Sequence, residues 1–482
     1  MEANGDVSNA DGSSTNGPDS NGSSSSGSSS NGANNERIRK VILGLGKTGL
    51  SCARYFAKLG VPFAVMDARP QPELLAELRR LDTAATFSQL KEDTFFNPQN
   101  IEELVVSPGI PLSTRAIQQA ISDGIGVNGD VNIFLKQAVV PVIGITGSNG
   151  KSTVTALLGE ILKSSGLKVG VGGNIGTPCL DLLESDCDVY VLELSSYQLE
   201  TIADAKCEIA TVLNLSPDHL DRYESDTDYY STKAKIYSNA NIALRNSDLE
   251  FEFSFDQGTE LLNFSGKSPV NPCDYGILTD SSGTFLCQGN RKILDCNGIS
   301  MRGRHNAENA LAAVAIAERL GVSNEVIAET LKSFKGLPHR CELVAEISSN
   351  TFINDSKSTN PGSTIAAING FAGTSGSLVV ILGGQSKGAD FTTLRETLLA
   401  NQADVVIFGE DGPLLEESLD ECATNRVTTL EEALEVATRL SANGAKGDCV
   451  VLFSPACASF DQFRNFEHRG ERFCQLVQEM KS

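Results

Sequence analysis

The 482-residue sequence contains 12 cysteines but lacks any Cys-x-x-Cys pair. Some of the cysteines, such as Cys52 and Cys449, lie inside segments with the apolar pattern of helices or strands. Structural metal sites and redox dithiols usually need closely spaced cysteines, so the sequence predicts reduced and mostly buried thiols. Apolar runs long enough to cross a bilayer are also missing, and we expect no membrane insertion.

Positive charge is scarce, and the formal net charge is −22. This balance excludes nucleic acid and acidic membranes as bulk partners. The segment 1–36 is rich in Ser, Gly and Asn, has no Lys or Arg, and has Val7 as its only branched apolar residue. Such a segment cannot offset its ordering entropy, which predicts a disordered tail. Because it is neither a basic transit peptide nor an apolar secretion signal, we expect a cytoplasmic protein.

The remaining length predicts about three domains of about 150 residues each. Short apolar strands alternate with helical patterns throughout, which is typical of α/β domains with parallel sheets. Between 251 and 301 the runs become short and alternating, which predicts an antiparallel patch. The composition shifts place the domains at 37–129, 130–336 and 337–482.

The first domain opens with a strand at 40–43 that leads into Gly44-Leu45-Gly46-Lys47-Thr48-Gly49. A helical pattern follows, and the next strand ends at Asp67. This is the G-x-G-x-x-G arrangement of a Rossmann-like βαβ unit, with an acidic residue after the second strand. A nucleotide-binding first domain is therefore predicted.

A second glycine-rich turn follows the apolar strand 142–146 and reads Gly147-Ser148-Asn149-Gly150-Lys151-Ser152-Thr153. Gly144 and Gly150 enclose five residues, so the pattern is a shorter relative of the common phosphate loop. Backbone N–H groups, the positive end of the helix and Lys151 would hold a triphosphate, while a hydroxyl reaches its magnesium. The turn predicts ATP binding.

Two further strands of the central segment end in residues that could carry chemistry. Glu193 ends a buried-looking strand, from which a carboxylate can meet the magnesium of a nucleotide. His219 follows the strand 211–215 and is expected near a metal or substrate. Lys233 and Lys235 lie on a helix, where the pattern favours a solvated charge for Lys235.

Polar loops in the third segment, at 354–361, 383–391 and 454–463, each follow an apolar strand. The carboxyl ends of parallel strands share one edge of a sheet, so these loops are expected to converge there. Lys357 and Lys387 would then suit carboxylates or phosphates.

From about Ile38 to the C-terminus the chain closely resembles the Mur ligases. The likeness rests on the phosphate loop and on six further motifs: Gly172-Gly173-Asn174-Ile175-Gly176, Glu193-Leu194-Ser195-Ser196, Asp218-His219, Gly336-Leu337-Pro338-His339-Arg340, Asn354-Asp355-Ser356-Lys357 and Ser454-Pro455-Ala456-Cys457-Ala458-Ser459. It implies a three-domain architecture, with a Rossmann-like N-terminal domain for a UDP-sugar, a central P-loop ATPase domain and a mobile Rossmann-like C-terminal domain for an amino acid.

The resemblance is strongest to family members of one specificity. It implies that ATP phosphorylates the free carboxylate of UDP-N-acetylmuramoyl-L-alanine, after which the amine of D-glutamate displaces phosphate from the acyl phosphate. The chain would then act as a monomer in peptidoglycan precursor synthesis.

The resemblance also implies roles for individual residues. Catalysis would involve Lys151, Glu193, His219, Lys233 and Lys387. ATP would contact Gly147, Ser148, Asn149, Gly150, Lys151, Ser152, Thr153, Asn306, Asn309, Arg340 and Asp355. The two other substrates would contact Thr48, Asp67, Arg69, Ser107, Gly109, Asn174, Lys357, Thr359, Lys387, Ser459, Phe460 and Phe466. Two magnesium ions would be held by Ser152, Glu193, His219 and Lys233, the last as a carbamylated lysine.

Two positions depart from the family pattern, with Lys47 in place of a leucine and Gln385 in place of an acid. Gly336-Leu337-Pro338 has the character of a hinge before the third domain. Three alternatives stay open: an oxidoreductase that binds a dinucleotide at Gly44–Gly49 and Asp67, a nucleotide sensor without ligase activity, and a related ligase for another amino acid or a folate acceptor.

Overall fold

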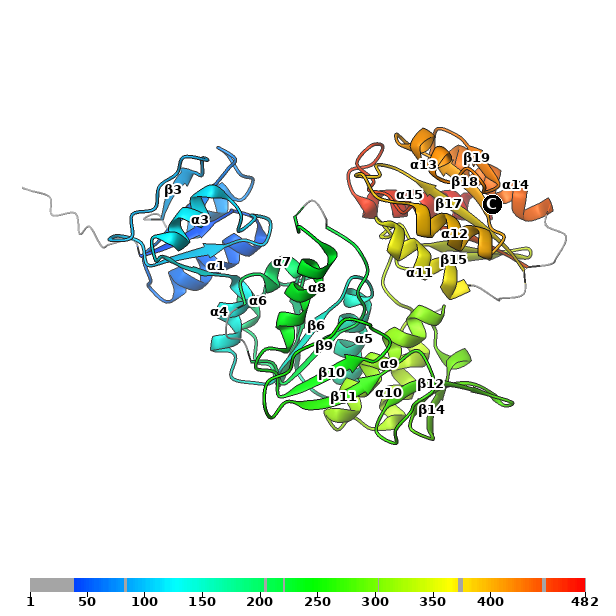
Figure 1. Cartoon of the computed structure of the whole chain (residues 1–482), viewed down its shortest axis with the longest axis horizontal. Helices are drawn as coiled ribbons and strands as arrows, with labels where there is room; N and C mark the ends of the chain where they lie inside the picture. Colours follow the sequence, from blue (N-terminus) through cyan, green and yellow to red (C-terminus); the bar gives the residue numbers. More distant parts are fainter. Residues whose placement is uncertain are drawn as a thin grey trace, which may run out of the picture. The chain divides into compact units, whose positions relative to one another are not determined.

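The computed structural model describes residues 39–81, 85–202, 206–219, 222–301, 303–371, 376–443 and 448–481. These residues all belong to one compact unit, Ile38–Ser482, and the tail predicted over 1–36 lies outside them. Within them, strands form three separate sheets (Figure 1). No helix in the described ranges is both long and apolar enough to cross a membrane.

The first sheet is parallel, with the strand order β3-β2-β1-β4-β5. Its central strand is buried on both faces, since Ile42 joins one core cluster while Val41 and Leu43 join another. This explains the continuous apolar run of β1. The elements are β1 Lys40–Leu43, α1 Lys47–Lys58, β2 Phe63–Asp67, α2 Leu75–Leu81, β3 Thr86–Gln89, β4 Glu103–Val106, α3 Arg115–Ser122 and β5 Gly126–Asn128.

The second sheet has the order β14-β13-β12-β11-β10-β9-β6-β8-β7 in the described part of the chain. The strand order reverses at β6, which places the loop after β6 at the point where such sheets bind ligands. Its strands are β6 Val142–Thr146, β7 Val169–Gly173, β8 Val189–Glu193, β9 Ile209–Val212, β10 Ile242–Asn246, β11 Glu260–Phe264, β12 Tyr275–Asp280, β13 Gly283–Gln288 and β14 Arg291–Asp295. Its helices are α4 Asp130–Gln137, α5 Lys151–Ser164, α6 Cys179–Leu182, α7 Ser196–Leu199, α8 Asp226–Ala234, α9 Arg304–Arg319 and α10 Asn324–Ser333, with 3-10 turns η1 Lys235–Tyr237 and η2 Cys296–Gly298.

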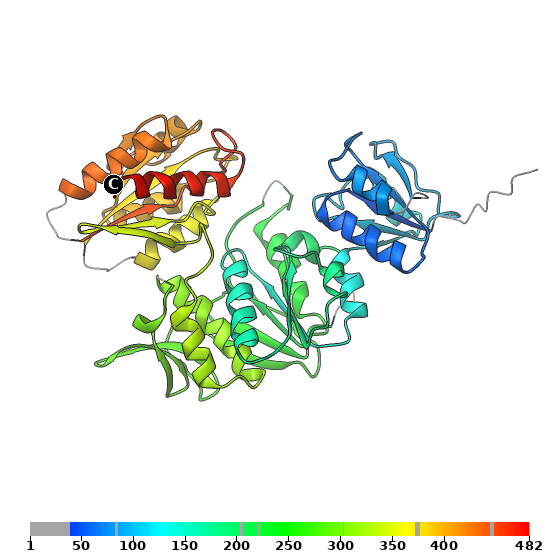
Figure 2. The same ribbon diagram turned by 180° about the vertical axis from the view of Figure 1, so that it is seen from behind.

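The third sheet has the order β15-β16-β20-β17-β18-β19. Helices cover both faces: Ile368, Leu394 and Leu415 pack on one, and Leu434 and Phe473 on the other. The last helix, α15, is the long red helix in Figure 2. The elements are β15 Glu342–Ile347, β16 Asn350–Asn354, α11 Pro361–Phe371, β17 Ser377–Gly383, α12 Thr392–Ala400, β18 Asp404–Phe408, α13 Gly412–Ser418, β19 Thr424–Arg426, α14 Leu430–Asn443, β20 Cys449–Phe453 and α15 Phe466–Glu479.

One apolar cluster spans the first and second sheets. It joins Leu50 and Phe56 of α1 to Phe134 of α4 and Leu180 of α6. Polar bonds border the same seam, since Ser51 Oγ and Arg54 Nη1 each lie 2.9 Å from a carboxylate oxygen of Asp181, which they donate to. The first two sheets are therefore joined through a shared core.

The predicted three-part α/β architecture is confirmed, with two corrections. The strand β11 runs parallel to β10, so the antiparallel patch expected over 251–301 is confined to β12–β14. The third sheet was expected to be parallel, but β15 is antiparallel to β16. A tight turn directly links β15 to β16, which permits only an antiparallel pair, whereas the chain from β10 to β11 is long enough for a parallel crossover.

The described cysteines are free thiols, as predicted, and most of them are buried. Burial raises the pKa of Cys207 and Cys457 to about 12, which keeps both thiols protonated at neutral pH.

Candidate active site

The loop between β6 and α5 is shaped to receive an anion. Gly147 and Gly150 have φ angles of +155° and +78°, which favour glycine. A Cβ atom at Gly150 would overlap the carboxamide of Asn309 on α9. The loop ends at the N-terminus of the 14-residue helix α5, where backbone N–H groups and the helix dipole favour negative charge.

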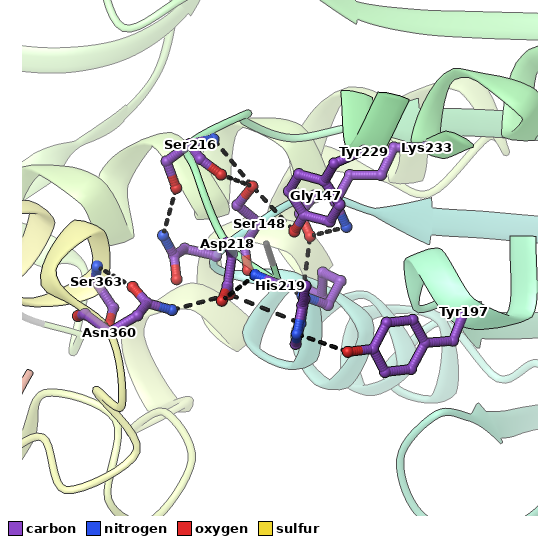
Figure 3. Close-up of polar contacts among 12 residues, drawn as sticks. Gly147, Ser148, Tyr197, Ser216, Asp218, His219, Tyr229, Lys233, Asn360 and Ser363 are labelled. Carbon is purple, nitrogen blue, oxygen red and sulfur yellow. Dashed lines mark hydrogen bonds and ion pairs between the residues drawn. The ribbon is translucent and has the colours of Figure 1, made fainter. Parts of the chain in front are cut away.

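This loop is fixed by the segment that follows β9. Asn149 N donates to Asn214 Oδ1 at 2.7 Å, and Asn214 Nδ2 donates back to Asn149 O at 3.0 Å. Ser216 N donates to Ser148 Oγ at 2.9 Å (Figure 3). The conformation of the loop is therefore fixed by reciprocal hydrogen bonds.

Two lysines from different helices meet at one carbonyl of the loop. Lys151 Nζ lies 2.9 Å from Gly147 O and 2.9 Å from Ser148 O, and Lys233 Nζ of α8 lies 2.8 Å from Gly147 O. Lys233 is 1% exposed, and its Nζ lies 4.6 Å from the ring centre of Tyr229. Burial, reinforced by the charge of Lys151, holds the pKa of Lys233 well below its usual value. Burial thus disfavours the charged form of this amine.

Glu193 ends β8 beside the loop and is 2% exposed. Asn174 Nδ2 donates to its Oε1 at 2.6 Å, and Asn174 N donates to its backbone O at 2.8 Å. Its other carboxylate oxygen, Oε2, is buried without a hydrogen-bond partner among the described residues. A buried carboxylate oxygen needs compensation, so Glu193 fits a cation ligand.

His219 lies on the loop after β9 with a φ angle of +57°. Tyr197 Oη and His219 Nδ1 are 2.8 Å apart, and the other ring nitrogen lies 3.7 Å from Asp218 Oδ2. The same Asp218 oxygen accepts a bond from Asn360 Nδ2, at 3.0 Å, from the segment after β16 (Figure 3). The structure thus brings His219 next to the α8 residues, with Tyr229 6.0 Å from its ring.

Residues near the third sheet also reach this site. Arg340 Nη2 donates to Ser152 Oγ on α5 at 2.8 Å. Asp355 accepts from Ser454 Oγ at 2.7 Å and from Cys341 N at 3.1 Å, and burial raises its pKa to about 6. A carboxyl with this pKa is mostly charged at pH 7, but its neutral form is far more populated than in an exposed aspartate.

Positive charge dominates around the loop. Burial lowers the pKa of Lys151 and Arg340, and burial together with these two cations lowers the pKa of Lys357 to about 8. Lys233 is a fourth basic residue beside the loop, and Glu193 is the acid whose charge most raises the pKa of Lys151 and of Arg340. Half-buried cations gathered at one loop favour a polyanionic ligand such as a triphosphate.

The glycine-rich turn of the first sheet is arranged differently. Both oxygens of Asp67 are occupied, since Leu45 N donates to Oδ2 at 2.7 Å and Arg69 donates from N, Nε and Nη2. These bonds, those of Arg69 above all, lower the pKa of Asp67 to about 2. Ser107 Oγ donates to Gly44 O at 3.1 Å, beside the exposed Gly109.

The three loops of the third sheet converge at one edge, as predicted: Gly383 N donates to Pro455 O at 2.9 Å, and Ser454 bonds Asp355. Lys357 and Lys387 lie over different rings, at 4.6 Å from Phe466 and 5.6 Å from Phe460. Lys387 and Phe460 are exposed, so this half of the expected amino-acid pocket is open. The other expected residues here are Thr359, which is half-buried, and Ser459, which is 2% exposed.

The remaining expected residues lie on helices and loops around the phosphate loop and in the two outer sheets. Asn306 and Asn309 are buried on α9 and bond each other at 3.2 Å, next to Gly150. Thr153 is 4% exposed on α5, and Thr48 is half-buried on α1. At the two atypical positions, Lys47 is exposed, and Gln385 Nε2 donates to Glu410 Oε2 at 2.9 Å, so an acid is present beside Gln385 after all.

The expectation of a solvated Lys235 is wrong. Its Nζ donates to Glu200 O at 3.1 Å, and burial lowers its pKa. The cause is local: the α-helix ends at Ala234, and Lys235 begins a 3-10 turn that redirects its side chain towards α7.

Sequence reasoning overlooked several polar residues that build the site. Asn214 clamps the loop, Tyr229 covers Lys233, and the buried Arg469 bonds three loops of the third sheet. Arg222 forms a bidentate pair with Glu200 and donates to Pro108 O at 2.9 Å. Their only signal was position next to recognised motifs, since Arg222 closely follows His219 and Arg469 follows His468.

Comparison with known proteins adds independent evidence. Residues 38–129 match the family model described as Mur ligase MurD-like, N-terminal domain, residues 145–317 match the Mur ligase middle domain, and residues 339–457 match the Mur ligase, glutamate ligase domain. Among solved structures, MurF from Acinetobacter baumannii aligns with a TM-score of 0.55 at 18% identity, covering 92% of this chain and 94% of that one. MurC from Thermotoga maritima aligns with a TM-score of 0.54 at 19% identity, covering 92% and 100%. At these identities the structures show a shared fold.

Curated relatives are much more similar in sequence. UDP-N-acetylmuramoylalanine--D-glutamate ligase from Hahella chejuensis is 43% identical over 440 residues, covering 90% of this chain and 97% of the relative. The proteins with the same name from Nitrosococcus oceani and Pseudomonas aeruginosa are 44% and 40% identical over 92% of this chain, and the alignments cover 97% and 98% of those proteins. With its phosphate loop, its buried cations and matches along nearly its whole described length, the chain belongs to the Mur ligase family.

Proposed function

We propose that this chain is an ATP-dependent ligase that joins D-glutamate to UDP-N-acetylmuramoyl-L-alanine in peptidoglycan precursor synthesis. The relatives that bear this activity in their names are 40–44% identical over at least 90% of the chain. The observation that carries the chemistry is the pair of half-buried cations, Lys151 and Arg340, that meet at the loop Gly147–Gly150 and at Ser152 beside it. Such a site binds a triphosphate and stabilises the charge that spreads over a phosphoryl group during transfer.

The reaction proceeds in two steps. A carboxylate oxygen of the UDP-sugar peptide attacks the γ-phosphorus of ATP, and ADP leaves. The amine of D-glutamate then attacks the acyl carbon, phosphate leaves with the bonding electron pair, and the amine loses a proton. Lys151 and Arg340 would hold the phosphoryl oxygens, and Asn306, Asn309 and Asp355 the rest of the nucleotide.

The residues present fit magnesium, with the buried Glu193 Oε2 as the clearest sign. Ser152 Oγ, Glu193 and His219 would be the direct protein ligands. The described residues hold no group of three or more His, Cys, Asp or Glu that could bind a metal by itself, so phosphates and water would complete the shell. When bound, magnesium would neutralise phosphate charge and align the reacting oxygens.

Lys233 fits carbamylation, because its Nζ is buried and its lowered pKa favours the neutral amine. A neutral amine adds CO₂ and releases a proton, which replaces a cation with a carboxylate. That carboxylate would suit a second magnesium ion near His219, where an ammonium would repel it. Catalytic roles are proposed on this basis for Lys151, Glu193, His219, Lys233 and Lys387.

The other substrates are assigned to the two outer sheets. Thr48, Asp67, Arg69, Ser107, Gly109 and Asn174 would hold the UDP-sugar peptide. Lys357, Thr359, Lys387, Ser459, Phe460 and Phe466 would line the D-glutamate pocket. Domain limits at 37–129, 130–336 and 337–482, a monomeric state and a cytoplasmic location complete the proposal. Gly336, with a φ of +90°, would act as the hinge before the third domain.

Transfer of labelled oxygen tests the proposal directly. The protein is incubated with ATP, D-glutamate and UDP-N-acetylmuramoyl-L-alanine that carries ¹⁸O in its free carboxylate. One labelled oxygen is expected in the released phosphate, because the acyl C–O bond breaks. Unlabelled phosphate would contradict an acyl-phosphate route. When the amino acid is varied, phosphate release should occur with D-glutamate alone. Equal rates with L-glutamate, or with a folate in place of the UDP-sugar peptide, would overturn the proposed specificity.

A further inference from the structure

Arg469 is a buried charged residue on α15, and the proposed reaction gives it no role. It lies in the first turns of α15 and is 0% exposed. Burial lowers its pKa to about 10, so the guanidinium is still charged at neutral pH. Its hydrogen-bond partners are neutral oxygens: Nε donates to Ser356 Oγ at 3.1 Å, and Nη2 donates to Ser356 O at 2.8 Å. A buried cation is costly, and the nearby charges of Asp461 and Asp355 offset only part of this cost, since the pKa of Arg469 is still lowered.

The partners of Arg469 come from all three converging loops. Ser356 follows β16, Gly383 ends β17 and Cys457 follows β20. Nη1 donates to Gly383 O at 3.3 Å and to Cys457 O at 3.0 Å. One rigid, planar group therefore fixes three backbone segments relative to each other, which lysine could not do with the same geometry.

These loops carry the residues assigned to the D-glutamate pocket. Lys357 directly follows Ser356, and Ser356 Oγ donates to Phe466 O at 2.8 Å. Lys357 Nζ in turn lies 4.6 Å from the Phe466 ring. Displacing the Arg469 guanidinium would therefore move both Lys357 and Phe466. In contrast, the bonds that hold the phosphate loop come from Asn214 and Ser216, which belong to the second sheet.

We propose that Arg469 is a positioning residue for the amino-acid pocket, which sets the geometry of the three loops and adds a fixed positive charge behind them. The inference rests on the proposed function. D-glutamate brings two carboxylates, so a buried cation behind the pocket favours its binding without touching it. The bonds that hold the phosphate loop do not involve Arg469, so formation of the acyl phosphate is expected to depend on it far less.

Separating the two half-reactions tests the proposal on the full chain. Hydroxylamine traps the acyl phosphate as a hydroxamate when D-glutamate is omitted, so trapping reports on the first step alone. Arg469→Met is expected to raise the KM for D-glutamate at least about tenfold, while hydroxamate formation and the KM for ATP stay within about twofold of wild type. Arg469→Lys keeps the positive charge but loses the planar guanidinium that bonds several acceptors at once, so an intermediate KM for D-glutamate is expected.

Arg472 provides the matched control, because it lies one turn further along α15 and its Nε pairs with the surface residue Glu431 at 2.8 Å. Arg472→Met should leave all three KM values unchanged. Ser356→Ala removes one hydrogen-bond acceptor of the guanidinium. It tests the positioning role of Arg469 if the Arg469→Met variant does not fold. It should raise the KM for D-glutamate alone.

Two results would overturn the inference: equal losses in trapping and in D-glutamate use, or an unchanged KM for D-glutamate in Ser356→Ala and Arg469→Lys. Failure of wild-type protein to form any hydroxamate would instead contradict the proposed reaction itself.

Discussion

Two glycine-rich turns of this chain look alike in sequence and differ in structure. Gly44–Gly49 joins β1 to α1, and Gly147–Gly150 joins β6 to α5, each at the point where the strand order of its sheet reverses. The lysine of the first turn, Lys47, is exposed, whereas Lys151 of the second is half-buried and donates to carbonyl oxygens of its own loop. Sequence similarity between turns therefore does not predict the same use.

The acids near the two turns differ as well. Asp67 is saturated by Leu45 and Arg69, while Glu193 keeps one buried oxygen without a partner. A carboxylate already bonded to its own main chain is poorly placed to recognise a ribose hydroxyl of a dinucleotide. The first turn thus favours recognition through Arg69 and backbone groups, and the second favours a metal–triphosphate.

The largest expected effect is the difference in kcat/KM between variants of Lys151 and of Lys47. Lys151→Ala removes a half-buried charge from the proposed triphosphate site and should reduce kcat/KM by about three orders of magnitude. Lys47→Ala removes an exposed charge and should change it less than about twofold. Steady-state phosphate release measures both. Comparable losses in the two variants would abolish the distinction between the turns.

Lys233 and Lys235 sharpen the comparison within the second site. Lys233→Ala should lower kcat about a hundredfold or more, with partial recovery when acetate or formate supplies the missing carboxylate. Lys235→Ala loses one bond to Glu200 O and should reduce the rate only severalfold, without recovery. A Lys233→Ala enzyme that keeps wild-type rates would remove this lysine from the metal site.

A smaller effect is expected at the first turn. Asp67→Asn weakens the bonds from Leu45 and Arg69, and a hydrogen bond to a charged group is worth about 1.5–3 kcal/mol. The Kd for the UDP-sugar peptide should therefore rise roughly tenfold, while the Kd for ATP is unchanged. Isothermal titration with each ligand checks this, and an effect on ATP instead would place nucleotide at the first turn.

The smallest effect concerns pH. The pKa of Asp67 is about 2, so binding at the first turn should not titrate between pH 6 and pH 9. Lys357 has a pKa of about 8, is charged below it and loses its proton as the pH rises through it. The ratio of kcat/KM for D-glutamate in wild type to that in Lys357→Arg should fall severalfold above about pH 8. A ratio that stays constant with pH would mean that the charge of Lys357 does not contribute to the use of D-glutamate.

Much of the fold could be predicted from sequence because its strands are apolar runs buried on both faces. β6 and β8 are fully buried along their length and were placed within one residue of their observed limits. The thinly buried edge strands β3, β5 and β19 carry no such pattern and were missed. Tertiary pairing, rather than local propensity, decides these strands.

The site shows the same division. Residues that follow strands in a recognisable motif, such as Lys151 and Glu193, were identified because loop position and residue type agree. Residues that hold other residues in place, such as Asn214 and Arg469, were not identified, because they belong to no recognisable sequence motif. Whether such a side chain points inward depends on packing between segments distant in sequence, as the misread Lys235 shows.

The shared core between α1 and the helices α4 and α6 has a consequence for unfolding. Because Phe56, Phe134 and Leu180 belong to one cluster, the first two sheets should melt as a single cooperative unit, whereas the third sheet has cores of its own. A nucleotide that binds only near β6 would then also protect the first sheet against heat and proteases, although it touches none of its residues.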